Sequence, residues 1–300
     1  YVRYANLISM SIFITGSESF LGNYLKKILK SKKIKFTGID NIKSKDSIKY
    51  NILDKNFAKI IPPKTKSIIH LAAISSTNDF KKNSQKAFEI NVNGTYNIIK
   101  AASERKVKKI IFASSEWVYG EFSKDNIKEN RAIDYLDLGS EYALSKAIGE
   151  NLIQYYCKKF NIDYVIFRFG IIYGPRFTKA NWSAVESIAH KIFLGEKNIQ
   201  VGSAKTARRF IFVEDVASAL YESTKSTKTG IYNLSGDKLI TLRDIINLSG
   251  DIIGQKIKII EKDKINFNFR NTANDLVKKT FKWKPQYDFK KGLKEIFKSF

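Results

Sequence analysis

The chain has 300 residues, of which 43% are hydrophobic, and it carries a formal net charge of +24 and one cysteine, Cys157. This length and apolar content are enough to bury a full core, so we expect one large α/β domain, alone or with a smaller lobe. A single cysteine excludes a disulfide framework and predicts a reducing, cytoplasmic location. No apolar run reaches the roughly 18 residues that a transmembrane helix needs.

A charge of +24 would ordinarily suggest nucleic acid as a partner. Here the lysines are spread along the whole chain, and the longest basic clusters are short, such as Lys278-Lys279 and Lys290-Lys291. This pattern favours a solvated lysine surface over a nucleic-acid stripe, although the charge helps to attract anionic small molecules. Residues 1–9 lack the layout of a signal peptide. The one methionine, Met10, directly precedes the first predicted strand, so we interpret 1–9 as an extension without functional content.

The segment 11–22 predicts a strand that turns tightly into a helix. Such a turn directs backbone N–H groups and the positive end of the helix dipole at one point, which suits a phosphate. Glycine is expected at Gly16 for the turn and at Gly22 for close packing of helix and strand. The middle position of the usual three-glycine pattern is Ser19, so this stretch alone fits an ordinary βα turn equally well.

Strand and helix signals alternate through the chain, which predicts a doubly wound parallel sheet. A second strand ends at Asp40, 24 residues after Gly16. An acid there can accept both ribose hydroxyls of an adenosine and would repel a 2′-phosphate, which favours NAD over NADP. A turn-starting aspartate followed by Asn41 is the alternative interpretation.

Further strands are expected at 67–73, 109–113, 163–169 and 208–213, with helices over 141–161 and 215–225 and short strands and helices after Gly230. The segment 50–54 is a candidate adenine contact, and Asn91, on the helix after the 67–73 strand, is a candidate cofactor contact. His70 is interpreted as structural. The polar stretch 121–140 reads as a long loop, and loops of this length inside compact domains are usually functional.

Tyr142 and Lys146 lie four residues apart on one predicted helix face. A free phenol, with a pKa of about 10, is a poor base at neutral pH, and a neighbouring ammonium is expected to lower that pKa. Such a tyrosine can take a proton from an alcohol as hydride moves to a nicotinamide. Ser115, at the end of the 109–113 strand, can hydrogen-bond the same substrate oxygen.

With these residues in order, the sequence resembles the extended short-chain dehydrogenase/reductase family, of the NAD-dependent epimerase/dehydratase type. The resemblance runs from Ile12 nearly to the C-terminus and rests on TGSESFLG (15–22), GID (38–40), HLAA (70–73), NVNGT (91–95), SSEWVYG (114–120), YALSK (142–146), RFGIIYGPR (168–176), RRFIFVEDVA (208–217) and FKWKP (281–285).

The resemblance implies a Rossmann domain over 10–170 with a return segment at 207–226, and a smaller C-terminal α/β substrate lobe built from 171–206 and 227–300. It implies catalysis by Ser115, Tyr142 and Lys146, a nucleotide-diphosphate sugar as substrate, and a homodimer formed through helices near 94–105 and 145–160. The implied NAD contacts are Gly16, Ser19, Phe20, Leu21, Gly22, Asp40, Asn41, Asn51, Ile52, Leu71, Ala72, Ala73, Asn91, Tyr142 and Lys146.

The implied substrate contacts are Glu116, Trp117, Trp182, Arg208 and Arg270. Arg208 and Arg270 match positions where the family clamps the diphosphate, with a salt bridge as the alternative for each, and Trp182 can equally be a packing residue. Ile171 replaces an asparagine that often contacts substrate phosphate in the family. No spacing of His, Cys and Asp predicts a metal site.

Glu116-Trp117 stands where a 4,6-dehydratase carries a second acid and base, usually Asp-Glu. Tryptophan cannot abstract a proton, so a dehydratase is disfavoured. An epimerase that oxidises a sugar hydroxyl transiently is the leading prediction. A reductase or dehydrogenase with an exchangeable cofactor is the alternative, and a non-catalytic module that binds RNA or protein is the second alternative.

Overall fold

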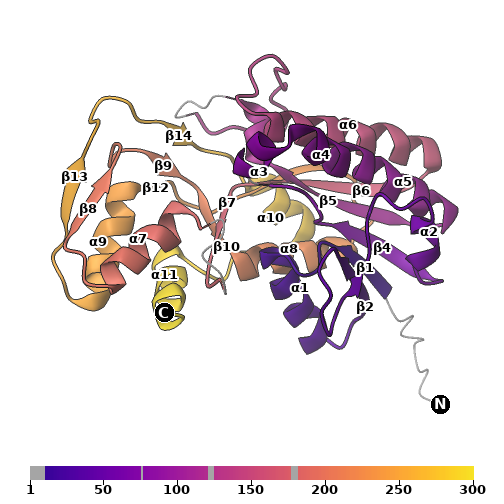
Figure 1. The fold of residues 1–300 in the computed structure, drawn as a ribbon, viewed down its shortest axis with the longest axis horizontal. Coiled ribbons are helices and arrows are strands. Elements are labelled where there is room, and N and C mark those ends of the chain that lie inside the picture. The colour runs from indigo at the N-terminus through magenta and orange to yellow at the C-terminus, as the bar shows by residue number, and fades with distance from the viewer. Residues whose placement is uncertain (1–10, 76, 121–124, 177–181) are drawn as a thin grey trace. The chain divides into compact units, whose positions relative to one another are not determined.

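The computed structural model describes residues 11–75, 77–120, 125–176 and 182–300 (Figure 1). The expectations for residues 1–9 and Met10, and those for 121–124, fall outside these ranges. The chain divides into two compact units. The first comprises 1–113, 148–166 and 220–230, and the second comprises 114–147, 167–219 and 231–300. Within the described residues, no helix has the length and apolar character needed to cross a membrane.

A seven-stranded sheet in the order β11-β6-β5-β4-β1-β2-β3 forms the centre of the fold, and the pairings that join β3, β2, β1, β4 and β5 are parallel. Its strands are β1 (Ser11–Thr15), β2 (Lys35–Asp40), β3 (Ile48–Lys49), β4 (Thr65–His70), β5 (Lys109–Ser115), β6 (Asp163–Phe169) and β11 (Gly230–Leu234). The order reverses at β1, because β2 lies on one side of it and β4 on the other. This confirms the doubly wound parallel sheet, whose ligands bind beyond the carboxyl ends of strands at such a reversal.

Helices cover both faces of this sheet, with α1 on one face and α5 on the other (Figure 1). The helices are α1 (Phe20–Ser31), α2 (Phe57–Ile60), α3 (Thr77–Lys82), α4 (Ser84–Phe88), the π-helix η1 (Glu89–Asn93), α5 (Gly94–Glu104), α6 (Glu141–Phe160) and α8 (Val213–Thr224). The strands between them read as continuous apolar runs, such as the fully buried β5, because a parallel sheet is buried on both faces.

The second unit contains three small sheets. β7 (Ile171–Tyr173) pairs with β10 (Phe210–Phe212), β8 (Asn198–Val201) pairs with β13 (Lys258–Glu261), and β9 (Ala207–Arg208) lies between β12 (Ile240–Thr241) and β14 (Phe269–Arg270). Its helical elements are η2 (Glu116–Tyr119), α7 (Ala184–Phe193), α9 (Leu242–Ile253), α10 (Asp275–Phe281) and α11 (Phe289–Lys298).

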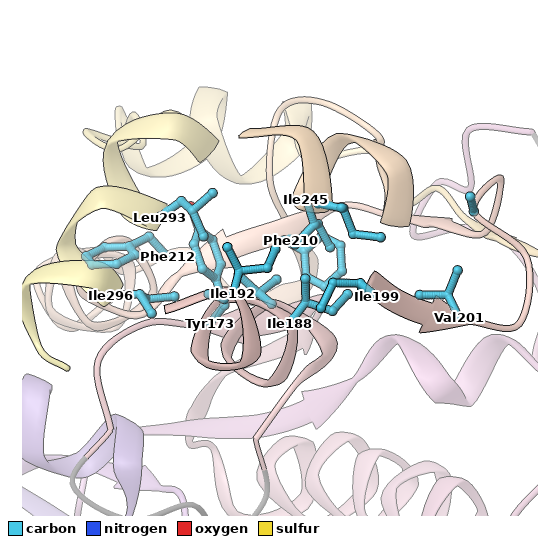
Figure 2. Close-up of a cluster of buried hydrophobic side chains, with 14 residues drawn as sticks. Tyr173, Ile188, Ile192, Ile199, Val201, Phe210, Phe212, Ile245, Leu293 and Ile296 are labelled. Atoms are coloured by element: carbon cyan, nitrogen blue, oxygen red, sulfur yellow. The ribbon is translucent and has the colours of Figure 1, made fainter. Parts of the chain in front are cut away.

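A large apolar cluster lies in the core of this unit (Figure 2). Tyr173, Phe210 and Phe212 of the β7–β10 pair pack against Ile188 and Ile192 of α7, and further side chains come from β8, α9 and α11. α7 and α9 both begin with a capping box, Ser183 with Glu186 and Thr241 with Asp244. The caps satisfy backbone N–H groups that would otherwise lack partners at the start of each helix.

Residues 114–147 belong to the second unit, whereas the sequence analysis assigned them to the Rossmann domain. The physical reason is hydrogen bonding with distant segments of the second unit. Ile127 N donates to Asn271 O at 2.8 Å, Ala273 N donates to Ile127 O at 2.8 Å, and the Asn233 amide donates to Ile127 O at 3.0 Å. These partners lie more than a hundred residues away along the chain, so no local pattern could reveal them.

Candidate cofactor pocket and catalytic residues

The turn from β1 into α1 needs glycine at two positions. Gly16 has φ of +70°, and a Cβ there would lie 2.6 Å from the backbone nitrogen of Ala72. A Cβ on Gly22 would lie 2.5 Å from the carbonyl oxygen of Gly16. Both glycine predictions are confirmed, and the second acquires a more specific reason, because Gly22 packs directly on the turn.

Ser19 occupies the middle position without needing glycine's conformational freedom, since its φ is −63°. It is the N-cap of α1, and its hydroxyl accepts a hydrogen bond from Gly22 N at 3.0 Å. An N-cap serine satisfies one of the first N–H groups of a helix, which explains how the turn forms with serine at this position.

Asp40 ends β2 beside this turn. Its Oδ2 accepts a hydrogen bond from Glu18 N at 2.9 Å, and its Oδ1 accepts one from Ile42 N at 3.3 Å. The backbone of the turn therefore orients the carboxylate that the sequence assigns to the adenosine ribose.

A cavity of about 230 Å³ lies against these residues. Nine of the predicted cofactor contacts line it, namely Gly16, Ser19, Asp40, Asn41, Asn51, Ile52, Leu71, Ala72 and Ala73. The sequence analysis did not single out Glu18, Ile39, Ile42, Ile74 and Ile90, and it named Tyr50 only within the adenine segment. This lining fits an adenine dinucleotide. The carboxylate suits a ribose, the apolar side chains suit an adenine, and the glycine turn at a helix start suits a pyrophosphate.

Other predicted cofactor residues do not line this cavity. Phe20 packs edge-on against Tyr24, with ring centroids 5.6 Å apart, and Leu21 is buried. Asn91 is buried, and its side-chain amide forms two hydrogen bonds with the backbone of Ile74: it accepts from the N–H at 2.8 Å and donates to the carbonyl at 2.9 Å. Asn91 thus fixes the cavity wall, and its direct contact with the cofactor stays a prediction.

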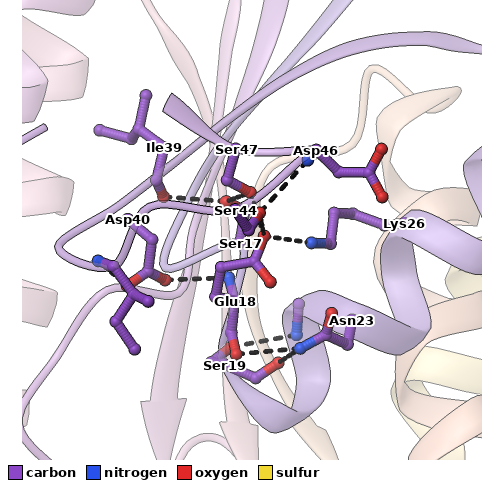
Figure 3. A network of polar contacts seen from close by, with 12 residues as sticks. Ser17, Glu18, Ser19, Asn23, Lys26, Ile39, Asp40, Ser44, Asp46 and Ser47 are labelled. Carbon is purple, nitrogen blue, oxygen red and sulfur yellow. Dashed lines mark hydrogen bonds and ion pairs between the residues drawn. The ribbon is translucent and has the colours of Figure 1, made fainter. Parts of the chain in front are cut away.

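Glu18 connects the turn to the segment that follows β2 (Figure 3). Its Oε1 accepts hydrogen bonds from the Lys26 ammonium, from Ser47 and, at 2.6 Å, from Ser44. These contacts hold the pKa of the Glu18 carboxyl below its usual value, although partial burial opposes them. Ser17 extends the network by bonding to Ser47 at 2.6 Å. The sequence feature that could have revealed this network is Glu18 itself, a charged residue in a turn of otherwise small residues.

His70 is structural, as predicted. It is buried, and its ring nitrogens lie 2.7 Å from the Thr15 hydroxyl and 3.1 Å from the Thr95 hydroxyl. Cys157 is a buried residue of α6, and burial raises the pKa of its thiol to about 12, which makes it inert. Among the described residues, no group of three or more His, Cys, Asp or Glu side chains is arranged to hold a metal ion.

In the second unit, Ser115, Tyr142 and Lys146 come together. Ser115 ends β5, and its side chain is hydrogen-bonded with the Tyr142 phenol from the start of α6. The Lys146 ammonium lies one helical turn further on, 6.0 Å from the centre of the Tyr142 ring. Ser115 and Lys146 are both buried. The four-residue spacing predicted that Tyr142 and Lys146 lie near each other on one helix, and the catalytic roles of the three residues stay predictions.

The predicted direction of the Tyr142 pKa is wrong. Burial raises this pKa to about 12, and the hydrogen bond from Ser115 only partly opposes the rise. Loss of water disfavours the phenolate more than the nearby polar groups stabilise it. Tyr142 is therefore a neutral phenol at neutral pH.

Glu116, the residue after Ser115, is buried next to two arginines. Its Oε2 accepts a 3.5 Å hydrogen bond from Thr272, and its Oε1 has no hydrogen-bond partner among the described residues. Burial raises the pKa of Glu116 to about 7, against the opposing charges of Arg270 and Arg208. Arg270 is also buried, and desolvation lowers its pKa to about 10.

Arg208 and Trp182 have contacts of different kinds. The Arg208 guanidinium donates to Ala207 O at 2.8 Å and to the Asn268 backbone and side-chain oxygens at 2.9 and 2.6 Å. The Trp182 ring lies 5.0 Å from His190 and 6.1 Å from Phe300, so it contributes to an aromatic cluster. Its contact with substrate stays a prediction.

The chain is similar to one family of known proteins. The model of the NAD dependent epimerase/dehydratase family matches residues 12–235. Among curated relatives, a UDP-glucuronate 4-epimerase of Thermodesulfobacterium geofontis is 27% identical, over 87% of this chain and 82% of its own length. A dTDP-D-glucose 4,6-dehydratase of Dictyostelium discoideum is 30% identical, over 81% of this chain and 63% of its own length.

Among solved structures, the UDP-glucose 4-epimerase of Thermus thermophilus, in complex with NAD, has a TM-score of 0.84 at 22% identity. The match covers 97% of this chain and 98% of that one. At this identity the similarity establishes the fold.

Proposed function

The chain belongs to the NAD dependent epimerase/dehydratase family, and we propose that within this family it is a nucleotide-sugar epimerase. NAD is the cofactor of the family. The relatives include both a 4-epimerase and a 4,6-dehydratase, so the choice between reactions depends on the residues of this chain.

Tyr142 acts as the base that takes a proton from a sugar hydroxyl, and Ser115 orients the same oxygen through its own hydroxyl. Before this step Tyr142 must lose its own proton to solvent, and Lys146, one turn along α6, stabilises the resulting phenolate. Bound NAD would supply the hydride acceptor and donor for the carbon that carries this oxygen, so that the hydride could return to the opposite face of the sugar. The proton held on Tyr142 then goes back to the oxygen, so no net oxidation occurs.

One observation favours epimerisation over dehydration. Trp117 stands where a dehydratase needs its second acid or base, and its ring lies 3.3 Å from the Arg270 guanidinium carbon. An indole stacked in this way cannot abstract a proton. Glu116 adds a single carboxyl, which is not the acid–base pair that elimination of water requires.

The positive charges of the second unit favour a nucleotide-diphosphate substrate. Arg208 and Arg270 both lie close enough to Glu116 to stabilise its ionised form, so the two guanidinium groups approach the same place. Guanidinium groups suit bidentate contacts with phosphate oxygens. We propose that they bind the diphosphate of the substrate.

The test is a panel of UDP- and dTDP-sugars incubated with purified protein and NAD, with products identified by proton NMR. We expect a pair of C4 epimers to interconvert without accumulation of NADH. Tyr142→Phe should lower the rate about 100- to 10,000-fold while NAD still binds. Tyr221→Phe, which removes a hydroxyl from a buried tyrosine of α8, is the matched control.

Two results would contradict the proposal. Stoichiometric consumption of NAD or NADH would identify the alternative, a reductase or dehydrogenase. Steeply salt-dependent RNA binding without turnover of any sugar nucleotide would identify a binding module instead.

We also propose a homodimer through α5 and α6. In the first unit the rings of Tyr96 and Tyr156 lie 5.1 Å apart, and the neighbouring Tyr155 is 63% exposed. Exposed aromatic side chains on adjacent helices are typical of protein–protein interfaces. Light scattering of the protein and of Tyr155→Glu tests this, because the variant should be monomeric.

A further inference from the structure

The donors around the Glu18 carboxylate are those that would bind a phosphate. One ammonium, from Lys26, and two hydroxyls, from Ser44 and Ser47, all point at Glu18 Oε1 (Figure 3). Lysine and serine are standard phosphate ligands, because each supplies hydrogen-bond donors to oxygen and lysine adds a positive charge. Here the protein's own carboxylate occupies the position of the anion.

This donor cluster lies at the ribose end of the cofactor cavity. Glu18 and Asp40 both line the cavity, and Glu18 N donates to Asp40 Oδ2 at 2.9 Å. Asp40 is the residue expected to accept the ribose hydroxyls. A 2′-phosphate on that ribose would therefore approach the hydroxyls and the ammonium that Glu18 engages.

We propose that Glu18 is a specificity-determining residue of the cofactor pocket: its carboxylate occupies a latent phosphate site formed by Lys26, Ser44 and Ser47, and so excludes the 2′-phosphate of NADP. Asp40 supplies repulsion at the ribose, and Glu18 removes the donors that would compensate for it. Because Lys26 is buried, its ammonium needs an anionic partner. If Glu18 is lost, an anion from solution or from the cofactor takes its place.

The experiment measures binding of 5′-AMP and 2′,5′-ADP, which differ by the 2′-phosphate, to cofactor-free protein by calorimetry in a buffer without phosphate or sulfate. The wild type should prefer 5′-AMP. In Glu18→Ser the dissociation constant for 2′,5′-ADP should fall by about tenfold or more relative to that for 5′-AMP, because the 2′-phosphate gains charge-assisted hydrogen bonds. NAD and NADP should show the same shift.

Two further variants identify the cause. Glu18→Ser/Lys26→Met should lose the gain, because the ammonium is gone. Glu222→Ser, which breaks the ion pair between Glu222 of α8 and Lys225 just after that helix, should leave the ratio unchanged although it changes the net charge equally. If Glu18→Ser does not fold, Glu18→Gln keeps the size of the side chain and takes its place.

An unchanged ratio in a folded Glu18 variant overturns the proposal. So does an equal gain in the double variant, since the effect would then come from loss of an acid and not from release of the donors. Sugar nucleotides are absent from this assay, so its outcome is independent of the proposed epimerase reaction.

Discussion

The Arg270 guanidinium carbon lies 3.3 Å from the centre of the Trp117 ring, so that the indole forms a platform for a buried cation. A cation on an aromatic face gains about 0.5–2 kcal/mol, more when water is excluded. Trp117→Ala should therefore lower the free energy of unfolding by about 1–2 kcal/mol and weaken sugar-nucleotide binding, because Arg270 loses its fixed orientation. Trp117→Phe retains a ring and should lose less of both. Urea unfolding and substrate titration measure the effects, and equal losses in the two variants would contradict the stacking argument.

Glu116 should make the protein less stable as the pH rises. Its pKa is raised from 4.5 to about 7 in the folded state. Between these values the folded protein keeps a proton that the unfolded chain loses, so the free energy of unfolding falls as pH increases through this window and then levels off. The full difference corresponds to roughly 3 kcal/mol.

Glu116→Gln should remove most of that pH dependence. Urea unfolding at pH 5 and pH 8 compares the two proteins. The remaining slope should come from Asp215, whose pKa burial raises to about 6, and from Glu129, whose pKa burial also raises. An identical slope in wild type and Glu116→Gln would show that Arg270 and Arg208 keep the carboxylate ionised.

Gly16 and Gly139 form a matched pair for the turn. Both have positive φ, +70° and +66°, but a Cβ on Gly139 would contact nothing within 4 Å. Gly139→Ala should cost only the strain of the left-handed conformation, about 1–2 kcal/mol, and should leave NAD affinity unchanged. Gly16→Ala adds overlap with Ala72, so it should cost more and weaken NAD binding at least about tenfold, since the loop backbone that faces the pyrophosphate must move. Comparable NAD affinities in the two variants would contradict this.

Ser19 should matter for the helix more than for the cofactor. Ser19→Ala removes the N-cap and should cost about 1 kcal/mol, whereas Ser19→Gly should cost a few tenths. NAD affinity of Ser19→Gly should equal or exceed that of the wild type. A large loss of affinity at unchanged stability would mean that the hydroxyl binds the cofactor.

The local patterns were sufficient to predict much of this fold and site. Gly16, Gly22 and Asp40 follow from turn and strand chemistry, and the four-residue spacing on a helix places Tyr142 near Lys146. These are short-range relations, which a sequence displays directly.

The features that could not be predicted from the sequence depend on contacts between residues far apart in the chain. Glu18 accepts hydrogen bonds from Ser44 and Ser47, which follow β2 in the chain. Glu116 accepts a hydrogen bond from Thr272, which lies 156 residues further along the chain. The Tyr142 pKa depends on how much water the folded surroundings exclude, so the spacing to Lys146 could not give its sign.

The π-helix η1 contains one residue more than a regular α-helix would need at this point. A π-helical turn contains one more residue than the α-helical turn it replaces, and here it lies between α4 and α5 and carries Asn91. Deleting Glu89 would let α4 and α5 join into a regular helix, because the remaining backbone can form the usual α-helical hydrogen bonds. It would also rotate Asn91 by about a quarter turn and break both hydrogen bonds to Ile74. The extra residue therefore fixes a wall of the cavity in which we expect NAD to bind, and a shortened chain should fold well and bind NAD poorly.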